Sequence, residues 1–154
     1  MQFNLSPKFA RLSLLLASLV AVKAATTQLS PGVTVVTANS QAELDTAIAN
    51  ITANSLVAPF VLTQVYVDSE YRGGVAALLG DGEHGDSGCL DMRNFGMDDV
   101  ISSFKMPSGV AWCDYWRDPG CLWLGIKDNK DEFRLSNMYG GWLNDAITSI
   151  HCSW

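Results

Sequence analysis

The chain has 154 residues, of which 48% are hydrophobic, and its 10 basic residues oppose 16 acidic residues for a net charge of −6. This acidic balance argues against nucleic acid and anionic membrane surfaces as partners and suits cation binding. The four cysteines predict two disulfides if the chain is secreted. Nucleophile-elbow, zinc-protease and phosphate-loop motifs are all lacking from the sequence, so we expect no enzyme.

Residues 1–24 resemble a secretory signal peptide. Lys8 and Arg11 precede an apolar run over residues 12–22, and Val22 and Ala24 place small residues where a signal peptidase cuts. A membrane anchor is the alternative, but the run is too short to span a bilayer comfortably, and no other segment is long enough. We therefore predict cleavage after Ala24 and a secreted, extracellular protein. Residues 1–24 hold three basic and no acidic residues, so the remaining chain carries 7 − 16 = −9.

Residues 25–56 are expected to form an N-terminal extension with one strand and one helix. Pro31-Gly32 marks a turn before a β-branched strand at residues 33–37. Ser40 and Glu43 form a capping box, and apolar residues at helical spacing predict a helix over residues 41–54. We expect this helix to cover part of the β-domain or one end of its core, with a processed pro-segment as the alternative. Asn50-Ile51-Thr52 is a glycosylation sequon.

From residue 57 onward the sequence predicts short strands separated by turns, in two similar halves, which is typical of an all-β sandwich. The predicted strands are 60–67, 75–79, 100–106, 110–115, 121–126, 133–138 and 146–154. We interpret the glycine-rich acidic segment 80–88 as a solvated linker, with a cation or catalytic loop as the alternative. The five tryptophans are expected to pack in the core or hairpins rather than form a ligand platform.

One hexapeptide pattern occurs in both halves. Asp98-Asp99-Val100-Ile101-Ser102-Ser103 and Asn144-Asp145-Ala146-Ile147-Thr148-Ser149 both fit [N/D]-[N/D]-x-x-[S/T]-S, 46 positions apart (144 − 98). Carboxylate, hydroxyl and carbonyl oxygens are the ligands that Ca²⁺ prefers. The pattern therefore predicts a calcium site in each half. The alternative is that both segments are only turns, which these residue types also favour.

On these motifs residues 57–154 resemble the βγ-crystallin family. The first half also carries the aromatic-x4-aromatic-x-Gly hairpin signature of that family, as Tyr66, Tyr71 and Gly73. The second half departs from it: the best equivalent is Trp116 or Tyr115, then Trp123 and Gly125, in a hairpin lengthened around Pro119-Gly120-Cys121. The resemblance implies a double Greek-key sandwich, with Greek key 1 at about 57–107, Greek key 2 at about 108–154, and the N-terminal strand and helix added to it.

The resemblance also implies residue roles. The calcium ligands would be the carboxylates of Asp99 and Asp145, the hydroxyls of Ser102 and Thr148, and backbone carbonyls near Val100 and Ala146. Asp98 and Asn144 would organise the loops, and Ser103 and Ser149 would hydrogen-bond the folded hairpins. Such low-charge sites bind calcium weakly, at about 10⁻⁵ to 10⁻³ M.

The fold implied by the resemblance has one sheet with four strands in a fixed order: the second, first and fourth strands of Greek key 2, then the third strand borrowed from Greek key 1. These strands would carry, in the same order, Cys121, Cys113, Cys152 and Cys89. Pairing of neighbours gives Cys113–Cys121 and Cys89–Cys152. The rival Cys113–Cys152 bridge would leave Cys89 and Cys121 on opposite edges of the sheet.

These expectations describe a secreted, non-catalytic protein whose fold calcium stabilises. Two alternatives use the same fold: a secreted killer-toxin-like or antifungal protein, and a protease inhibitor with a bait loop near Pro119. The fold alone does not choose among them, nor does the sequence name a protein or cell-surface partner.

Overall fold

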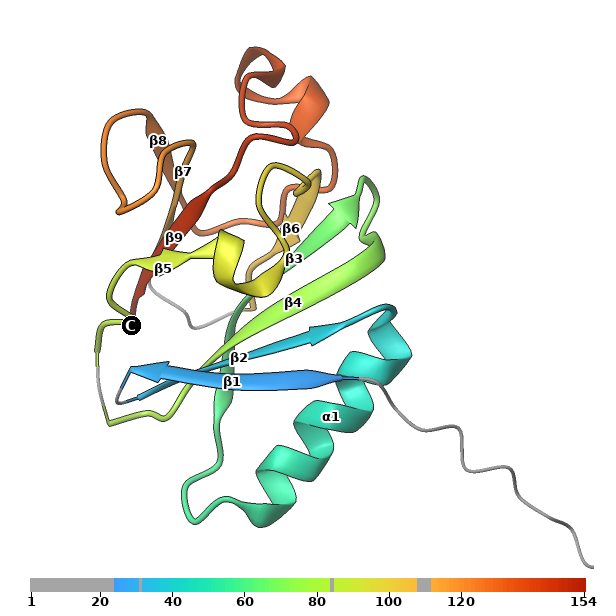
Figure 1. Cartoon of the computed structure of the whole chain (residues 1–154), viewed down its shortest axis with the longest axis vertical. Helices are drawn as coiled ribbons and strands as arrows, with labels where there is room; N and C mark the ends of the chain where they lie inside the picture. Colours follow the sequence, from blue (N-terminus) through green and yellow to red (C-terminus); the bar gives the residue numbers. More distant parts are fainter. Residues whose placement is uncertain (1–23, 31, 84, 108–111) are drawn as a thin grey trace, which may run out of the picture.

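The computed structural model describes residues 24–30, 32–83, 85–107 and 112–154. It contains two antiparallel sheets packed face to face (Figure 1). The predicted signal peptide lies outside the described residues, apart from Ala24. Over the part of the chain that is described, no helix is long and apolar enough to cross a membrane.

The first sheet has five strands in the order β1-β2-β4-β3-β6. They are β1 (Ala25–Ser30), β2 (Val33–Ala38), β3 (Phe60–Asp68), β4 (Arg72–Gly80) and β6 (Ser103–Lys105). The second sheet has the order β5-β9-β7-β8. Its strands are β5 (Leu90–Asp91), β7 (Trp112–Trp116), β8 (Gly125–Asp128) and β9 (Ser149–Ser153).

The two halves exchange strands. β5, from the first half, pairs with β9 of the second half. In return Glu132, from the second half, pairs with Phe104 in β6, through N–O hydrogen bonds of 2.8 and 2.9 Å. This exchange is the double Greek-key arrangement, so the predicted all-β fold is confirmed. The predicted strand order of the second sheet is also confirmed. The second, first and fourth strands of Greek key 2 are β8, β7 and β9, and the strand borrowed from Greek key 1 is β5, which is the order that the sheet has.

The core lies between the sheets and is mostly aliphatic, with Phe104 and Tyr115 as its fully buried aromatic side chains among the described residues. The rings of Phe104 and Tyr115 stack 4.1 Å apart, and the Tyr115 hydroxyl lies 2.8 Å from the buried Thr63 hydroxyl of the other sheet.

As expected, Trp142 and Trp154 pack against this core, and Trp112 lies beneath Lys127 of the paired hairpin strand β8, with Nζ 5.3 Å from the ring centre. The expectation that tryptophans fill the core or hairpins is wrong for Trp123, which is 85% exposed. Sequence composition does not distinguish the two roles, because a large aromatic side chain suits either a core or a surface contact.

The N-terminal extension enlarges the first sheet and covers its outer face. The β1–β2 hairpin adds to the β4 edge, and α1 (Gln41–Asn54) lies across the sheet (Figure 1). Leu44 and Ala47 of α1 pack with Tyr66 in a second apolar cluster, outside the core between the sheets. The predicted helix and its covering role are confirmed. β1 was not predicted, because its residues 25–27 have exposed side chains and the segment shows little hydrophobic pattern.

The capping box that predicts α1 forms in a shifted version. Glu43 N–H donates to the Ser40 hydroxyl at 3.4 Å, as the motif requires. The Glu43 carboxylate, however, accepts a 3.1 Å hydrogen bond from Asn39 N–H. Two backbone donors at the helix start are therefore satisfied by side chains.

Four strand predictions need correction, among them the strand at 146–154, which begins only at Ser149. The strand predicted at 133–138 is wrong, because this segment forms the 3₁₀ turn η2 (Leu135–Asn137), followed by η3 (Tyr139–Gly141). The strand predicted at 100–106 shrinks to β6, and the strand predicted at 121–126 begins only at Gly125. In the last case Cys121 and Trp123 have φ values of 55° and 70°, which no β-strand accommodates. A third 3₁₀ turn, η1 (Met92–Phe95), follows β5.

The predicted disulfide pairing is also wrong. The structure joins Cys113 to Cys152 and Cys89 to Cys121, with Cα–Cα distances of 4.1 and 5.8 Å. Cys113 and Cys152 face each other directly across β7 and β9. Cys121 lies in the β7–β8 connection, which folds back over the sheet until Cys121 N–H reaches the Ser149 hydroxyl on β9, at 3.0 Å. Strand order therefore does not govern Cys121, and the fold-back brings it to Cys89 beside β5.

Candidate metal centre

The two hexapeptides lie against each other and exchange hydrogen bonds between halves. The Ser102 hydroxyl donates to Asp145 Oδ1 at 2.6 Å, and the Thr148 hydroxyl lies 3.4 Å from Asp99 Oδ1. The backbones are linked in the same way, since Asp145 N–H donates to the carbonyl of Ile101 at 3.0 Å. The structure thus joins Asp145 with Ser102 and Asp99 with Thr148.

Both second-position aspartates have left-handed backbone conformations. Asp99 has φ 50° and Asp145 has φ 51°. Aspartate adopts this conformation more readily than most residues, because its short carboxylate bonds nearby polar groups. Two residues later, Ile101 and Ile147 are fully buried and anchor the loops in the core. The template treated this fourth position as variable, although the shared isoleucine was a readable signal.

The final serine of each hexapeptide holds the folded hairpin of its own half. Ser103 Oγ donates to the carbonyl of Asp68 at 2.7 Å and accepts from Tyr71 N–H at 3.2 Å. Ser149 Oγ donates to the carbonyl of Asp118 at 2.6 Å and accepts from Cys121 N–H. The resemblance implies that these serines hydrogen-bond the folded hairpins, and both do so.

The second hairpin is not lengthened, which corrects the sequence expectation. Tyr66 pairs with Val75 and Trp116 with Gly125, so the two hairpins have equal lengths. Positive φ values fall at equivalent places. They occur at Glu70, Tyr71 and Gly73 in the first hairpin and at Gly120, Cys121 and Trp123 in the second. The residue types hide this equivalence, because the disulfide-bonded Cys121 stands in the second hairpin where the first has the aromatic Tyr71.

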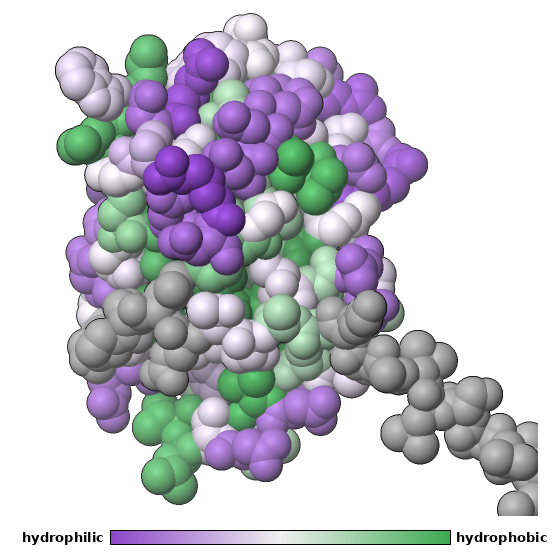
Figure 2. All heavy atoms as spheres, viewed as in Figure 1, coloured by the Kyte–Doolittle hydropathy of each residue, from purple (hydrophilic) through white to green (hydrophobic). Residues whose placement is uncertain are grey.

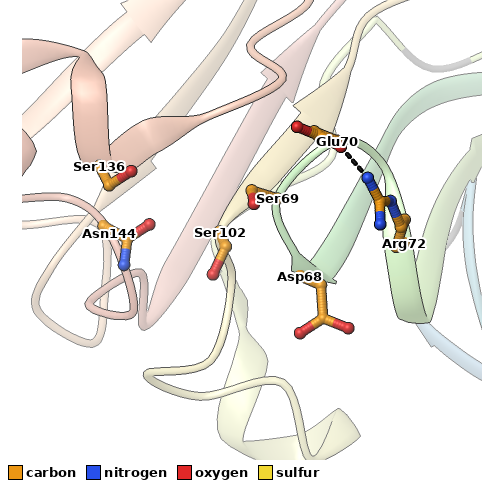
Figure 3. A pocket seen from close by; sticks show the side chains of 7 residues that line it. All are labelled: Asp68, Ser69, Glu70, Arg72, Ser102, Ser136 and Asn144. Carbon is orange, nitrogen blue, oxygen red and sulfur yellow. Dashed lines mark hydrogen bonds and ion pairs between the residues drawn. The ribbon is translucent and has the colours of Figure 1, made fainter.

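An open polar hollow of about 560 Å³ lies beside the Ser102–Asp145 pair. Residues from both halves line this hollow, and most of those from the first half belong to its hairpin, as Figure 3 shows. The lining residues are Asp68, Ser69, Glu70, Arg72, Ser102, Ser136 and Asn144. At the rim the Glu70 carboxylate forms ion pairs with Arg72 and Arg134. The Asn144 amide donates to Asp145 Oδ2 at 2.7 Å, which fixes the carboxylate.

The donor set fits a hard cation. Oxygens that share one Ca²⁺ at the usual bond lengths lie roughly 2.5–3.5 Å apart, and both carboxylate–hydroxyl pairs are within that range. Asp98 Oδ1 is buried without a hydrogen-bond partner among the described residues, and it lies next to Asp99 in the chain. Across the described ranges no three His, Cys, Asp or Glu residues cluster as a metal site. Any ion held here would need backbone carbonyls and water as its remaining ligands.

The segment 80–88 is only partly the linker that the sequence predicts. His84 lies outside the described residues. Asp86 forms a β-bridge with Ser153, and its carboxylate lies 2.9 Å from His151 Nε2. Hydrogen bonds from Gly88 N–H and from His151 lower the pKa of Asp86. The end of the segment is therefore fixed on β9.

Strand exchange, paired loops and folded hairpins together define a double Greek-key domain. Solved structures, among them βγ-crystallin domains, are similar to this chain. The N-terminal domain of protein S is 21% identical, with 59% of this chain and 94% of that chain covered, at a TM-score of 0.47. A βγ-crystallin domain from Clostridium beijerinckii is 20% identical, with 60% and 97% covered, at 0.47.

A third similar structure is a βγ-crystallin domain from Flavobacterium johnsoniae. It is 23% identical, with 60% of this chain and 94% of that chain covered, at a TM-score of 0.44. No protein-family model matches the sequence, and no curated protein matches it. The assignment to a fold class therefore depends on the strand exchange and the loop geometry themselves.

Proposed function

We propose that this chain is a secreted, non-catalytic protein that binds two calcium ions in its paired loops, and that calcium stabilises its fold. The observation that carries the proposal is the reciprocal pairing of Ser102 with Asp145 and of Thr148 with Asp99. Each pair brings one carboxylate and one hydroxyl together from different halves. A hydrogen bond between the halves does not require a carboxylate and a hydroxyl in both pairs. Two equivalent cation sites do require the same two kinds of ligand in each.

One site would use Asp145, Ser102 and the backbone carbonyl near Val100. The other would use Asp99, Thr148 and the carbonyl near Ala146. A bound calcium ion supplies positive charge that neutralises the carboxylate and ties both halves together. The surrounding chain is acidic, with −9 over residues 25–154, which favours cation binding at both sites.

Calcium titration calorimetry and melting curves test the proposal on protein secreted by cells that express the full chain. We expect two weak sites and a raised melting temperature. At a hundredfold excess of calcium over the dissociation constant, each site adds about 2.7 kcal/mol to the free energy of unfolding. The double variant Asp99→Ala/Asp145→Ala should lose both effects.

Asp45→Ala is the matched control, because Asp45 is an exposed aspartate on α1, away from the loops. It should bind calcium as the unchanged protein does. If the unchanged protein gives neither heat nor a melting shift, the hexapeptides are only turns and the proposal fails.

Secretion is tested by N-terminal sequencing of the protein recovered from the medium. The proposal expects Ala25, the first residue of β1, at the new N-terminus. The two disulfides are compatible with an extracellular location. Intact mass of the same sample shows whether Asn50, which is exposed on α1, carries a glycan. A protein that stays in the cell with residues 1–24 attached would contradict this part of the proposal.

A further inference from the structure

The tip of the β7–β8 hairpin is a projecting apolar surface. Leu122, Trp123 and Leu124, here called the apolar tip, are 58%, 85% and 60% exposed. Apolar side chains stand out at this end of the molecule, at the upper left of Figure 2. The proposed calcium binding involves none of these three side chains, and the core does not use them either.

The apolar tip is held rigidly. The disulfide from Cys121 to Cys89 fixes one side of it, and Arg117 N–H donates to the carbonyl of Leu124 at 3.0 Å. Trp123 has φ 70°, a conformation that a bulky side chain rarely adopts. An unfavourable conformation persists only where its surroundings enforce it, and such positions concentrate at binding sites. The three side chains are therefore held in the solvent instead of folding back onto the protein.

The size and shape of the apolar tip restrict what covers it. The three side chains of the apolar tip together expose roughly 400 Å² of surface, because one large aromatic side chain alone has about 150–250 Å². A stable protein interface buries about 800 Å² on each partner. A second copy of the chain would therefore gain too little contact. The positive φ values at Gly120, Cys121 and Trp123 also exclude the extended backbone that a protease bait loop needs.

We propose that the apolar tip inserts into the interfacial region of a bilayer of zwitterionic lipids, which carry no net charge. A convex group of one tryptophan and two leucines suits a soft apolar phase that closes around it, and tryptophan favours the boundary between lipid and water. The exposed Arg117 and the half-buried Asp118 precede the tip and match the two charges of a zwitterionic head group. The charge of −9 over residues 25–154 disfavours anionic lipid.

Co-sedimentation with phosphatidylcholine vesicles tests the inference on protein secreted from the full chain. The assay is done in chelator, so that it does not depend on the proposed calcium binding. Trp123→Gly removes the indole and suits the positive φ, and Leu122→Ser/Leu124→Ser leaves Trp123 in place. Leu56→Ser is the matched control, since Leu56 is fully exposed and follows α1 in the chain. Figure 1 shows α1 at the opposite end of the molecule from β8.

We expect the unchanged protein and Leu56→Ser to partition onto vesicles equally, and both tip variants to partition at least about tenfold less. Brominated phosphatidylcholine should quench the fluorescence of the unchanged protein but not that of Trp123→Gly. Adding phosphatidylserine should not strengthen binding. The serine variant decides the result if the glycine variant fails to fold.

Three results would overturn the inference. The first is the absence of vesicle binding by the unchanged protein, and the second is equal binding by both tip variants. The third is a dimer in solution that Trp123→Gly dissociates, because the apolar tip would then be covered by a second copy.

Discussion

Ser102 and Asp145 are 43 positions apart and belong to different halves, yet the serine hydroxyl donates a 2.6 Å hydrogen bond to the carboxylate. Thr148 and Asp99 repeat this relationship in the opposite direction. Each candidate site therefore takes one side chain from each half. A cation at either site would join the two halves in addition to the strand exchange.

The first prediction concerns this crossed pairing. Ser102→Ala/Asp145→Ala should remove one calcium site and leave the other intact, because both side chains serve the same ion. Ser102→Ala/Asp99→Ala should damage both sites, although it removes the same kinds of groups. Calorimetry measures the number of sites, and the first double variant should keep about 2.7 kcal/mol of calcium-dependent stability at hundredfold excess.

Double-mutant cycles provide the internal control for the crossed pairing. The effects of Ser102→Ala and Asp145→Ala on calcium binding should be strongly non-additive, whereas those of Ser102→Ala and Asp99→Ala should add. The opposite pattern would mean that each half binds its own ion without help from the other.

The second prediction concerns the disulfides. Peptide mapping without reduction should find Cys89 linked to Cys121 and Cys113 linked to Cys152. Replacing either pair by serine should lower the free energy of unfolding by about 4 kcal/mol, because the bridges close loops with sequence separations of 32 and 39. Urea denaturation measures this loss.

The two serine pairs should also differ from one another. Cys113 and Cys152 are fully buried, so their replacement leaves polar groups in the core and should cost more. Equal losses would show that chain entropy alone accounts for the stabilisation.

The features that the sequence predicted correctly are those with local signals. Ser40 and Glu43 indicate where α1 begins, and the helical spacing of apolar residues indicates its length. The strands β2, β3 and β4 likewise carry β-branched and apolar runs. For the candidate site, the repeated hexapeptide named Asp99, Ser102, Asp145 and Thr148, which the structure brings together in two pairs. Their binding of calcium stays a prediction.

The features that the sequence did not predict depend on contacts between distant residues. The Cys89–Cys121 bridge requires the hairpin to fold back over β9, and no spacing within the sequence encodes that movement. The second hairpin was misjudged because its conformation is kept while its side chains change. Cys121 and Trp123 adopt the backbone conformations of Tyr71 and Gly73 without resembling them. Backbone conformation enforced by tertiary contacts is not visible as residue type.

The third prediction concerns pH. Glu132 is buried beside Phe104, and its burial, followed by the negative charge of Asp128, raises the pKa of its carboxyl above the ordinary 4.5. The folded protein therefore holds this proton more tightly than the unfolded chain. Glu132 favours folding most below pH 4.5, and this contribution is lost as the pH rises through the raised pKa.

Glu132→Gln should accordingly raise the melting temperature at pH 7, and the gain should shrink as the pH falls to 4. Melting curves at several pH values in chelator measure this difference. Glu83→Gln, at an exposed glutamate, is the control and should show no such pH-dependent gain. A gain that is the same at pH 4 and pH 7 would show that the charge of Glu132 is not its cause.

The last prediction compares equivalent positions of the two hairpins. Trp123 has φ 70° and Gly73 has φ 76°, so the two residues share one conformation but only the glycine suits it. Trp123→Gly should stabilise the protein by about 0.5–1 kcal/mol, since relief of the left-handed conformation outweighs the added freedom of the unfolded chain. Gly73→Ala should destabilise it by about 1 kcal/mol or more, because the new Cβ would also meet the Asp68 carboxylate at 2.6 Å.

Trp123→Ala separates backbone strain from loss of the indole. It removes the exposed ring but keeps a Cβ, so it should gain little stability compared with Trp123→Gly. Urea denaturation of the three variants decides the matter. Equal gains from the alanine and glycine variants would mean that the indole itself destabilises the hairpin, and the backbone at residue 123 would then carry no strain.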